Sequence, residues 1–273
     1  MLITSMIIFG SIGVLRRQIN LSSALIAFCR GIMGASFILL VVRGKLAKTG
    51  AKNFMKLSIS GALLGINWLF LFEAYNFTSV PAATLFCYVN PAIVIILSSI
   101  LLHEKLTFKK FLCLALSLTG MILISGILDS LPCLSDTKGI LCALASALLY
   151  ALVVIMNKFI SGVEIYTKTI IQLIFSAVVL VPYLIFTGEF TAGEWNFTTL
   201  TALIIAGLVN TGFAYVLYFA SIENLNAHTV ALFSYIDPVT ALILSALFLG
   251  ESLTFSGLAG AGLILISPII CGE

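Results

Sequence analysis

Charged residues are scarce in this chain of 273 residues. They make up 9% of it, whereas a soluble domain carries about a quarter. Because 61% of the residues are hydrophobic, the chain could not keep a soluble surface. Its apolar runs, roughly 20 residues long, suffice to cross a hydrocarbon core of ~30 Å. The scarcity of charge excludes a soluble protein, gives no basis for a nucleic-acid partner, and predicts an all-α membrane protein whose surroundings are the lipid bilayer.

Motifs of metal binding, catalysis and nucleotide binding are also missing. The six cysteines form no Cys-x-x-Cys pair, which argues against a metal site or a disulfide framework. No His-Glu-x-x-His, Gly-x-Ser-x-Gly or Walker sequence occurs. We therefore expect no metal, no cofactor and no enzyme activity. Transport by this chain alone would be driven by an ion gradient, by exchange or by the substrate gradient rather than by ATP.

The apolar runs predict ten transmembrane spans. They cover roughly residues 2–19, 24–42, 56–75, 81–102, 109–127, 138–158, 167–187, 198–220, 228–249 and 255–270. With the basic stretch 43–56 placed in the cytoplasm, ten lysines and arginines fall on the inner side and three on the outer side. This bias predicts a multi-pass protein of the cell (plasma) membrane with both termini in the cytoplasm.

One stretch is repeated later in the chain. Residues 81–108 (PAATLFCYVNPAIVIILSSILLHEKLTF) and 228–255 (HTVALFSYIDPVTALILSALFLGESLTF) are identical at 12 of 28 positions without a gap. The identities include Pro91 with Pro238 and Glu104 with Glu251, which hydrophobic composition does not explain. The repeat indicates an internal duplication into residues 1–130 and 131–273.

The duplication fixes the expected architecture. Five spans are an odd number, so the two halves must cross the membrane in opposite directions. We therefore predict ten transmembrane helices arranged as two inverted-topology five-helix repeats. In secondary transporters built this way, the substrate binds near the membrane midplane between repeats that rock about it. The protein is expected to be a monomer or a homodimer.

The same residues resemble a known family. An aromatic-x-x-Pro motif followed by a Gly/His-Glu-x-Leu-Thr ending occurs in both the fourth and the ninth span, and Arg30 stands early in the second span. This pattern resembles the ten-span EamA-type branch of the drug/metabolite transporter superfamily, with two EamA domains. The resemblance implies a transporter of small molecules. Members export amino acids, drugs and other metabolites, and some import.

Polar residues at membrane depth are the first site candidates. Asn90-Pro91 and Asp237-Pro238 occupy equivalent places near the midplane, and each proline is a candidate helix hinge because it removes a backbone hydrogen bond. Asp237 is the most informative, because a carboxylate at this depth costs about 3 kcal/mol and is retained by default for function. It could face a cationic substrate group, carry a proton, or bond only to backbone freed by Pro238. Glu73 is a second candidate for proton coupling.

The other predicted substrate-pathway residues are aromatic or amide-bearing. Each has an alternative interpretation as helix packing, which the sequence leaves open. They are Asn67, Trp68, Phe72, Tyr88, Tyr150, Asn210, Tyr215, Tyr218 and Tyr235.

Several conspicuous residues are interpreted as structural. Glu104 and Glu251 are expected to cap or join helices, and Arg30 to pair with a carboxylate near the outer interface. His228 is expected at the membrane interface, with proton sensing as the alternative interpretation. Gly61-x-x-x-Gly65 is expected to allow close helix packing.

The favoured function is a secondary active exporter of a small polar metabolite such as an amino acid or amine. The alternatives are a proton-coupled importer, a multidrug exporter of organic cations and, outside transport, a membrane scaffold.

Overall fold

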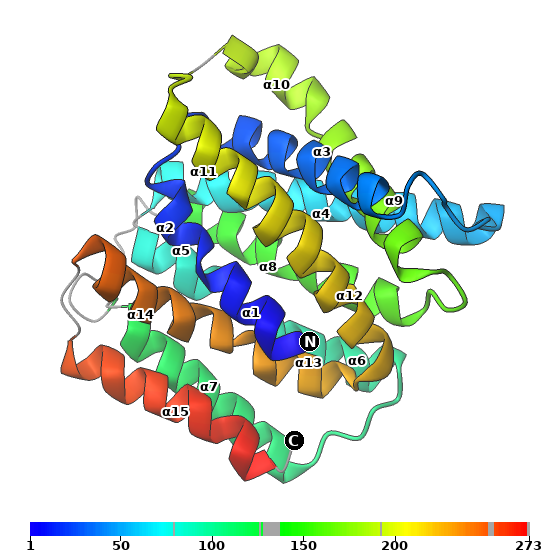
Figure 1. Ribbon diagram of the computed structural model, residues 1–273. Coiled ribbons are helices and arrows are strands. Elements are labelled where there is room, and N and C mark those ends of the chain that lie inside the picture. Colours follow the sequence, from blue (N-terminus) through cyan, green and yellow to red (C-terminus); the bar gives the residue numbers. More distant parts are fainter. Residues whose placement is uncertain (79, 126, 128–136, 192, 251–253, 272–273) are drawn as a thin grey trace.

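A computed structural model describes residues 1–78, 80–125, 127, 137–191, 193–250 and 254–271 (Figure 1). Within these ranges the chain is helical apart from its connecting links, and β-type pairing is limited to an isolated bridge between Leu21 and Gly193. The prediction of an all-α membrane protein is confirmed. The proposed boundary between residues 130 and 131 lies outside the described residues.

The helices before residue 128 are α1 (Leu2–Gly10), α2 (Ile12–Arg16), α3 (Ser23–Val41), α4 (Ala51–Phe77), α5 (Val80–Cys87), α6 (Asn90–Leu101) and α7 (Phe108–Ser125). Those after residue 136 are α8 (Thr137–Lys158), α9 (Ile165–Val178), α10 (Val181–Thr187), the 3-10 helix η2 (Glu189–Thr191), α11 (Phe197–Gly207), the π-helix η3 (Leu208–Phe213), α12 (Ala214–Asn224), α13 (Ala227–Ser234), α14 (Ile236–Leu249) and α15 (Phe255–Cys271).

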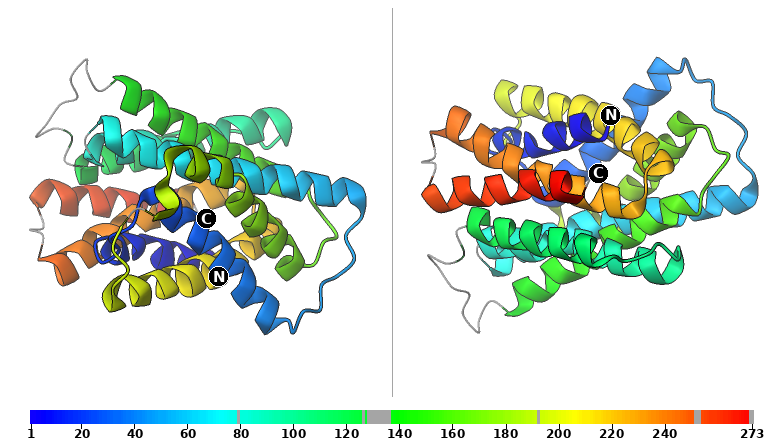
Figure 2. Two further views of the ribbon diagram at one scale, coloured as in Figure 1. Left: turned by 90° about the horizontal axis from the view of Figure 1, so that it is seen from above. Right: turned by 90° about the horizontal axis from the view of Figure 1, so that it is seen from below.

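These helices reproduce the ten predicted spans. Among the described residues, 8 segments are long and apolar enough to cross a membrane, and two shorter apolar segments form the first and last spans. The third span begins earlier than predicted: α4 starts at Ala51, so Lys52 and Lys56 lie on the helix rather than in a loop. The remaining link between α3 and α4 projects beyond the neighbouring helices (Figure 2).

The fourth and ninth spans are broken at their prolines rather than merely kinked. Each consists of two helices, α5 with α6 and α13 with α14, separated just before Pro91 and Pro238. A proline ring cannot donate a hydrogen bond and clashes with the carbonyl four residues earlier, so the first helix ends there. At Pro91 that carbonyl belongs to Cys87, and it accepts a hydrogen bond of 3.1 Å from Asn90 Nδ2. A hinge role for the two prolines stays a prediction.

The eighth span contains a π-helix that the sequence does not predict. In η3 the Thr211 hydroxyl donates to the carbonyl of Ala206, five residues earlier, at 2.9 Å. Gly34 of α3 packs tightly here, since a Cβ on it would lie 3.0 Å from the nitrogen of Gly212. Such π-segments occur frequently at functional sites.

Contacts between the halves follow the predicted inverted repeat. α7 packs against α15 at one edge of the molecule (Figure 1). Ser117 Oγ of α7 donates to Ser267 Oγ of α15 at 2.9 Å. Gly120, three residues later on α7, lies against Ile264, which is three residues earlier on α15. The two helices are therefore antiparallel. The packing of the third span on the sixth (α4 on α8) also has its counterpart in the packing of the eighth span on the first (α12 on α1).

A second junction between the halves joins α4 to α8 and α9. Ser60 donates to Gln172 Oε1 at 2.8 Å, and the amides of Asn157 and Gln172 bond each other reciprocally at 3.0 and 3.1 Å. All three side chains are fully buried or nearly so. Gly61 and Gly65 lie directly against the backbone of α9, which confirms the predicted close approach of α4 to a neighbour. We call this junction the α4–α8–α9 seam.

Candidate functional site

A cavity of about 430 Å³ lies between the two halves. Its wall comes from α1 and α2, α3, α4, α5 and α6, α8, α12, α13 and α14. Among the described residues, α7 and α15 do not contribute. α3 contributes Ile26 and Arg30. The volume suits a small molecule.

Most of the predicted substrate-pathway residues line this cavity, and they come from spans far apart in the sequence. They are Asn67, Trp68, Phe72, Tyr88, Asn90, Tyr150, Tyr215 and Asp237. Three others do not reach it. Tyr218 and Tyr235 are fully buried behind the wall, and Asn210 bonds α1 through the Ile8 carbonyl and, at 2.9 Å, the Ser11 hydroxyl.

Aromatic rings form the floor of the cavity. Tyr215 lies 4.9 Å from Phe9 and 6.1 Å from Trp68 between ring centroids, and Tyr150 stacks on Tyr218 at 6.2 Å. Tyr218 in turn packs against Phe219 at 5.8 Å. The floor thus presents aromatic faces to the cavity and is backed by a second layer of rings.

The two equivalent polar residues beside the prolines are used differently. The side-chain amide of Asn90 donates a hydrogen bond to the Cys87 carbonyl, which has no helical partner because Pro91 lacks an N–H. Asp237 has no N–H to offer in this way, and its carboxylate accepts a hydrogen bond from the Tyr88 hydroxyl of the other half. Opposite, α1 comes close at Gly10, where a Cβ would lie 2.6 Å from the Asp237 carbonyl oxygen. Asp237 thus lines the cavity where α1 and α14 pack closely together.

Within the described ranges, Arg30 does not make the expected pair with a carboxylate. It lines the cavity, its side chain is buried, and its Nε donates to Thr211 Oγ1 at 3.0 Å. The guanidinium carbon lies 5.5 Å from the centre of the Trp68 ring. The expected carboxylate partner is not found among the described residues. A charged residue inside an apolar span was the signal that could have identified it.

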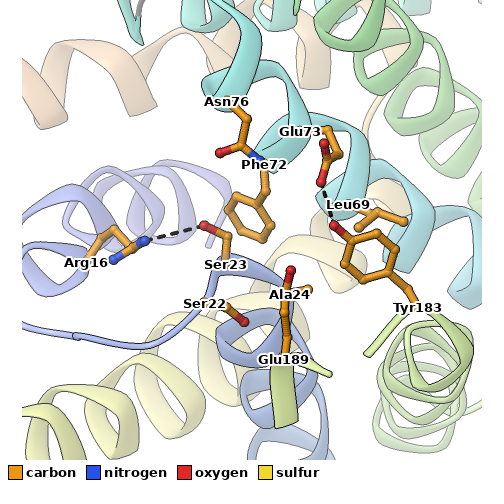
Figure 3. A pocket seen from close by; sticks show the side chains of 10 residues that line it. All are labelled: Arg16, Ser22, Ser23, Ala24, Leu69, Phe72, Glu73, Asn76, Tyr183 and Glu189. Carbon is orange, nitrogen blue, oxygen red and sulfur yellow. Dashed lines mark hydrogen bonds between the residues drawn. The ribbon is translucent and has the colours of Figure 1, made fainter. Parts of the chain in front are cut away.

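A smaller hollow of about 270 Å³ adjoins the cavity (Figure 3). Arg16 and Phe72 line both spaces. Glu73 lies in this hollow, not in the main cavity, and accepts a hydrogen bond of 2.5 Å from the Tyr183 hydroxyl. Figure 3 shows Arg16 reaching toward Ser23, to which it donates at 3.4 Å. Proton coupling through Glu73 stays a prediction.

The opposite end of the bundle is closed by Glu104, which follows α6 and reaches the N-terminus of α13. Its Oε1 accepts from Ala227 N at 3.0 Å, and its Oε2 accepts from His228 N at 3.4 Å and pairs with His228 Nδ1. Burial raises the pKa of the Glu104 carboxyl, but the hydrogen bonds and the charge of His228 outweigh it, so the net pKa is below the usual value. The expected interhelical role of Glu104 is confirmed, and that of Glu251 lies outside the described residues.

His228 is the second residue of α13, and its side chain is fully buried, with Nδ1 paired to the Glu104 carboxylate. Its place at the membrane interface stays a prediction. Further charges lie at the same end. Lys168 Nζ is 3.6 Å from Glu223 Oε2, and Lys158 donates to the Leu225 carbonyl. We call this end, from Glu104 to Lys168, the closed end.

Comparison with known proteins now decides the family. The profile of the EamA-like transporter family matches residues 1–126 and again residues 137–271. The chain belongs to the EamA-like transporter family.

Relatives of this EamA-family protein agree with that assignment. It is 30% identical over 256 residues to the uncharacterized transporter YxxF of Bacillus subtilis, covering 91% of this chain and 81% of the relative. It is 28% identical over 208 residues to protein RarD of Escherichia coli, covering 76% and 67%. A crystal structure superposes with a TM-score of 0.83 at 16% identity, covering 98% of this chain and 94% of that chain, which supports the fold. The protein is a multi-pass membrane transporter.

Proposed function

We propose that this EamA-family transporter is a secondary active exporter of a small polar metabolite, such as an amino acid or amine, in the cell membrane. The observation that carries the proposal is the central cavity, which both halves line and which holds charged, amide and aromatic groups at membrane depth. Polar groups in such places typically mark substrate pathways. The family resemblance favours export, and the distribution of basic residues favours termini in the cytoplasm.

Alternating access supplies the mechanism. Gly13 and Arg16, at one end of the cavity, are exposed, while the other end is closed by buried aromatic rings and by the Glu104 contact. The walls at the centre are the broken helices α5–α6 and α13–α14, one pair from each half. Helices interrupted at membrane depth are typical of transporter binding sites. In the other state the closed end would open and the exposed end would close.

Asp237 has two uses consistent with this geometry. Its carboxylate could bind an ammonium group, assisted by the faces of Tyr88, Trp68 and Tyr215. It could instead carry the proton that couples transport to a gradient. Export of organic cations is the second candidate function, which the same carboxylate and aromatic walls favour. The buried guanidinium of Arg30 in the same cavity disfavours it.

The test is transport by purified protein in proteoliposomes. Vesicles would be preloaded with single amino acids, amines, nucleobases or sugars, and counterflow of the labelled compound would be measured with and without an imposed pH gradient. We expect counterflow for at least one amino acid or amine. Empty vesicles give the background. Failure of every compound class to exchange above that background would refute the proposed function.

Replacing Asp237 separates its two uses. Asp237→Asn keeps the shape and removes the charge, so the protein should fold but lose either substrate binding or the pH dependence of transport. Asn90→Ala, at the equivalent position, is expected to have the milder effect. Wild-type transport by Asp237→Asn at every pH from 5 to 8 would leave Asp237 with a structural role.

A further inference from the structure

Arg30 is a buried charge without a counter-charge among the residues that the structure describes. It is 9% exposed and stands on α3 within an apolar span. An arginine at the centre of a membrane helix costs about 2.5–3.5 kcal/mol on insertion scales, and such residues normally pair with a carboxylate or line a polar cavity. Among the described residues no carboxylate lies within ion-pair distance of it. It does line the cavity.

The arginine is held from one side. Its Nε donates to Thr211 Oγ1 at 3.0 Å, and the Thr211 hydroxyl donates in turn to the Ala206 carbonyl at 2.9 Å, so the threonine oxygen is oriented to accept. Trp68 covers one face of the guanidinium at 5.5 Å. A guanidinium has five N–H donors, and the Nε bond and the ring contact engage only part of it. The remaining donors belong to the planar fork that matches a carboxylate.

We propose that Arg30 binds a carboxylate group of the transported substrate inside the central cavity. The inference rests on the proposed function, because it assumes that the cavity holds a transported molecule. It narrows the substrate class to small molecules with a carboxylate. Asp237 lines the same cavity and offers the opposite charge. A substrate that also carries an ammonium group would bind Arg30 through its carboxylate and Asp237 through its ammonium group.

The first test compares wild-type binding of matched ligands. L-leucine and L-phenylalanine would each be compared with their carboxamides and with the amines that lack the carboxylate, by thermal shift and by tryptophan fluorescence, since Trp68 adjoins the guanidinium. We expect the acids to bind about 10- to 100-fold more tightly than the amides, the range for one hydrogen bond to a charged group. Equal or tighter binding of the amides or amines overturns the proposal and leaves the proposed function standing.

The second test uses variants. Arg30→Gln should lose the preference for acid over amide, Arg30→Lys should retain part of it, and Thr211→Val should weaken it by less than Arg30→Gln. Arg43→Gln is the matched control, because Arg43 is exposed in the link after α3. Folding is checked by size-exclusion chromatography. A folded Arg30→Gln with an unchanged preference overturns the assignment. If Arg30→Gln does not fold, the wild-type comparison decides.

The two failures can be told apart. Binding or counterflow of amines but not acids refutes only the role of Arg30. Absence of binding and of counterflow for acids, amides and amines alike refutes the proposed function and the Arg30 assignment with it. Stabilisation by chloride alone, with no preference among the organic ligands, also refutes the assignment.

Discussion

The closed end of the cavity gives the sharpest prediction, because one carboxylate joins the two halves there. Glu104 accepts hydrogen bonds from two backbone N–H groups at the start of α13 and pairs with the His228 ring, while its side chain is only 18% exposed. Loss of a helix cap costs about 0.5–2 kcal/mol, and loss of a hydrogen bond to a charged group about 1.5–3 kcal/mol. The terms share one carboxylate and are not additive. We expect Glu104→Ala to favour opening by about 2–3 kcal/mol.

This free energy corresponds to a roughly 100-fold shift in the equilibrium between closed and open ends. The assay is the rate at which a membrane-impermeant thiol reagent modifies a single cysteine in a background without the six native cysteines. Val230→Cys reports on the closed end, because Val230 is buried on α13. Gly13→Cys reports on the exposed end, where a side chain meets no atom within 4 Å.

We expect Glu104→Ala to speed modification at position 230 by tens of fold and to slow it at position 13. Glu164→Ala is the matched control. Its carboxylate also caps a helix N-terminus, accepting from Tyr166 N at 3.0 Å and Thr167 N at 2.8 Å, but within its own helix. An unchanged rate at position 230 would refute the reasoning. Faster modification at both reporters would mean general unfolding.

Three further predictions concern pH and packing. The lowered pKa of Glu104 means that its contribution is fully present above the ordinary value of about 4.5 and is lost as pH falls through the lowered value. Glu104 should therefore stay ionised from pH 8 down to pH 5. Over this range we expect the modification rate of the cysteine at position 230, divided by the rate of a free thiol at the same pH, not to rise through protonation of Glu104. Gly65→Val should lower the apparent melting temperature, because its Cβ would collide with Ser176, and overpacking costs about 1–3 kcal/mol; an unchanged melting temperature would contradict the close packing. Leu116→Trp on α7 should alter stability more than substrate preference in counterflow, and a changed preference would contradict the peripheral place of α7.

The sequence predicts the helical spans well because hydropathy and span length depend directly on the bilayer. The main polar residues of the cavity were also predictable. Asn90 and Asp237 stand beside prolines in otherwise apolar spans, where a polar side chain needs a reason. Arg30 satisfied the same rule, but it was interpreted as an interfacial residue, because the depth and facing of a residue depend on helix tilt and packing that the sequence does not specify.

Differences between the repeats are harder to predict. Tyr88 and Tyr235 match in the alignment, yet Tyr88 lines the cavity and bonds Asp237, whereas Tyr235 is fully buried. The cavity is exposed at one end and closed at the other, so the two halves are not in the same conformation. Residues at equivalent positions in the two halves therefore have different surroundings. The π-helix at 208–213 leaves no composition signal, because it requires an extra residue in a turn rather than a particular side chain.

The α4–α8–α9 seam limits how the two halves of the chain can move relative to each other. Separating Ser60 from Asn157 and Gln172 would leave several buried polar groups without partners, at about 1–3 kcal/mol for each. Sliding α4 along α9 would drive Gly61 and Gly65 against a backbone that already touches them. α4 is therefore held in one packed unit with two helices from the second half of the chain. A movement that separates residues 1–130 from residues 131–273 as two rigid bodies would therefore have to break this seam.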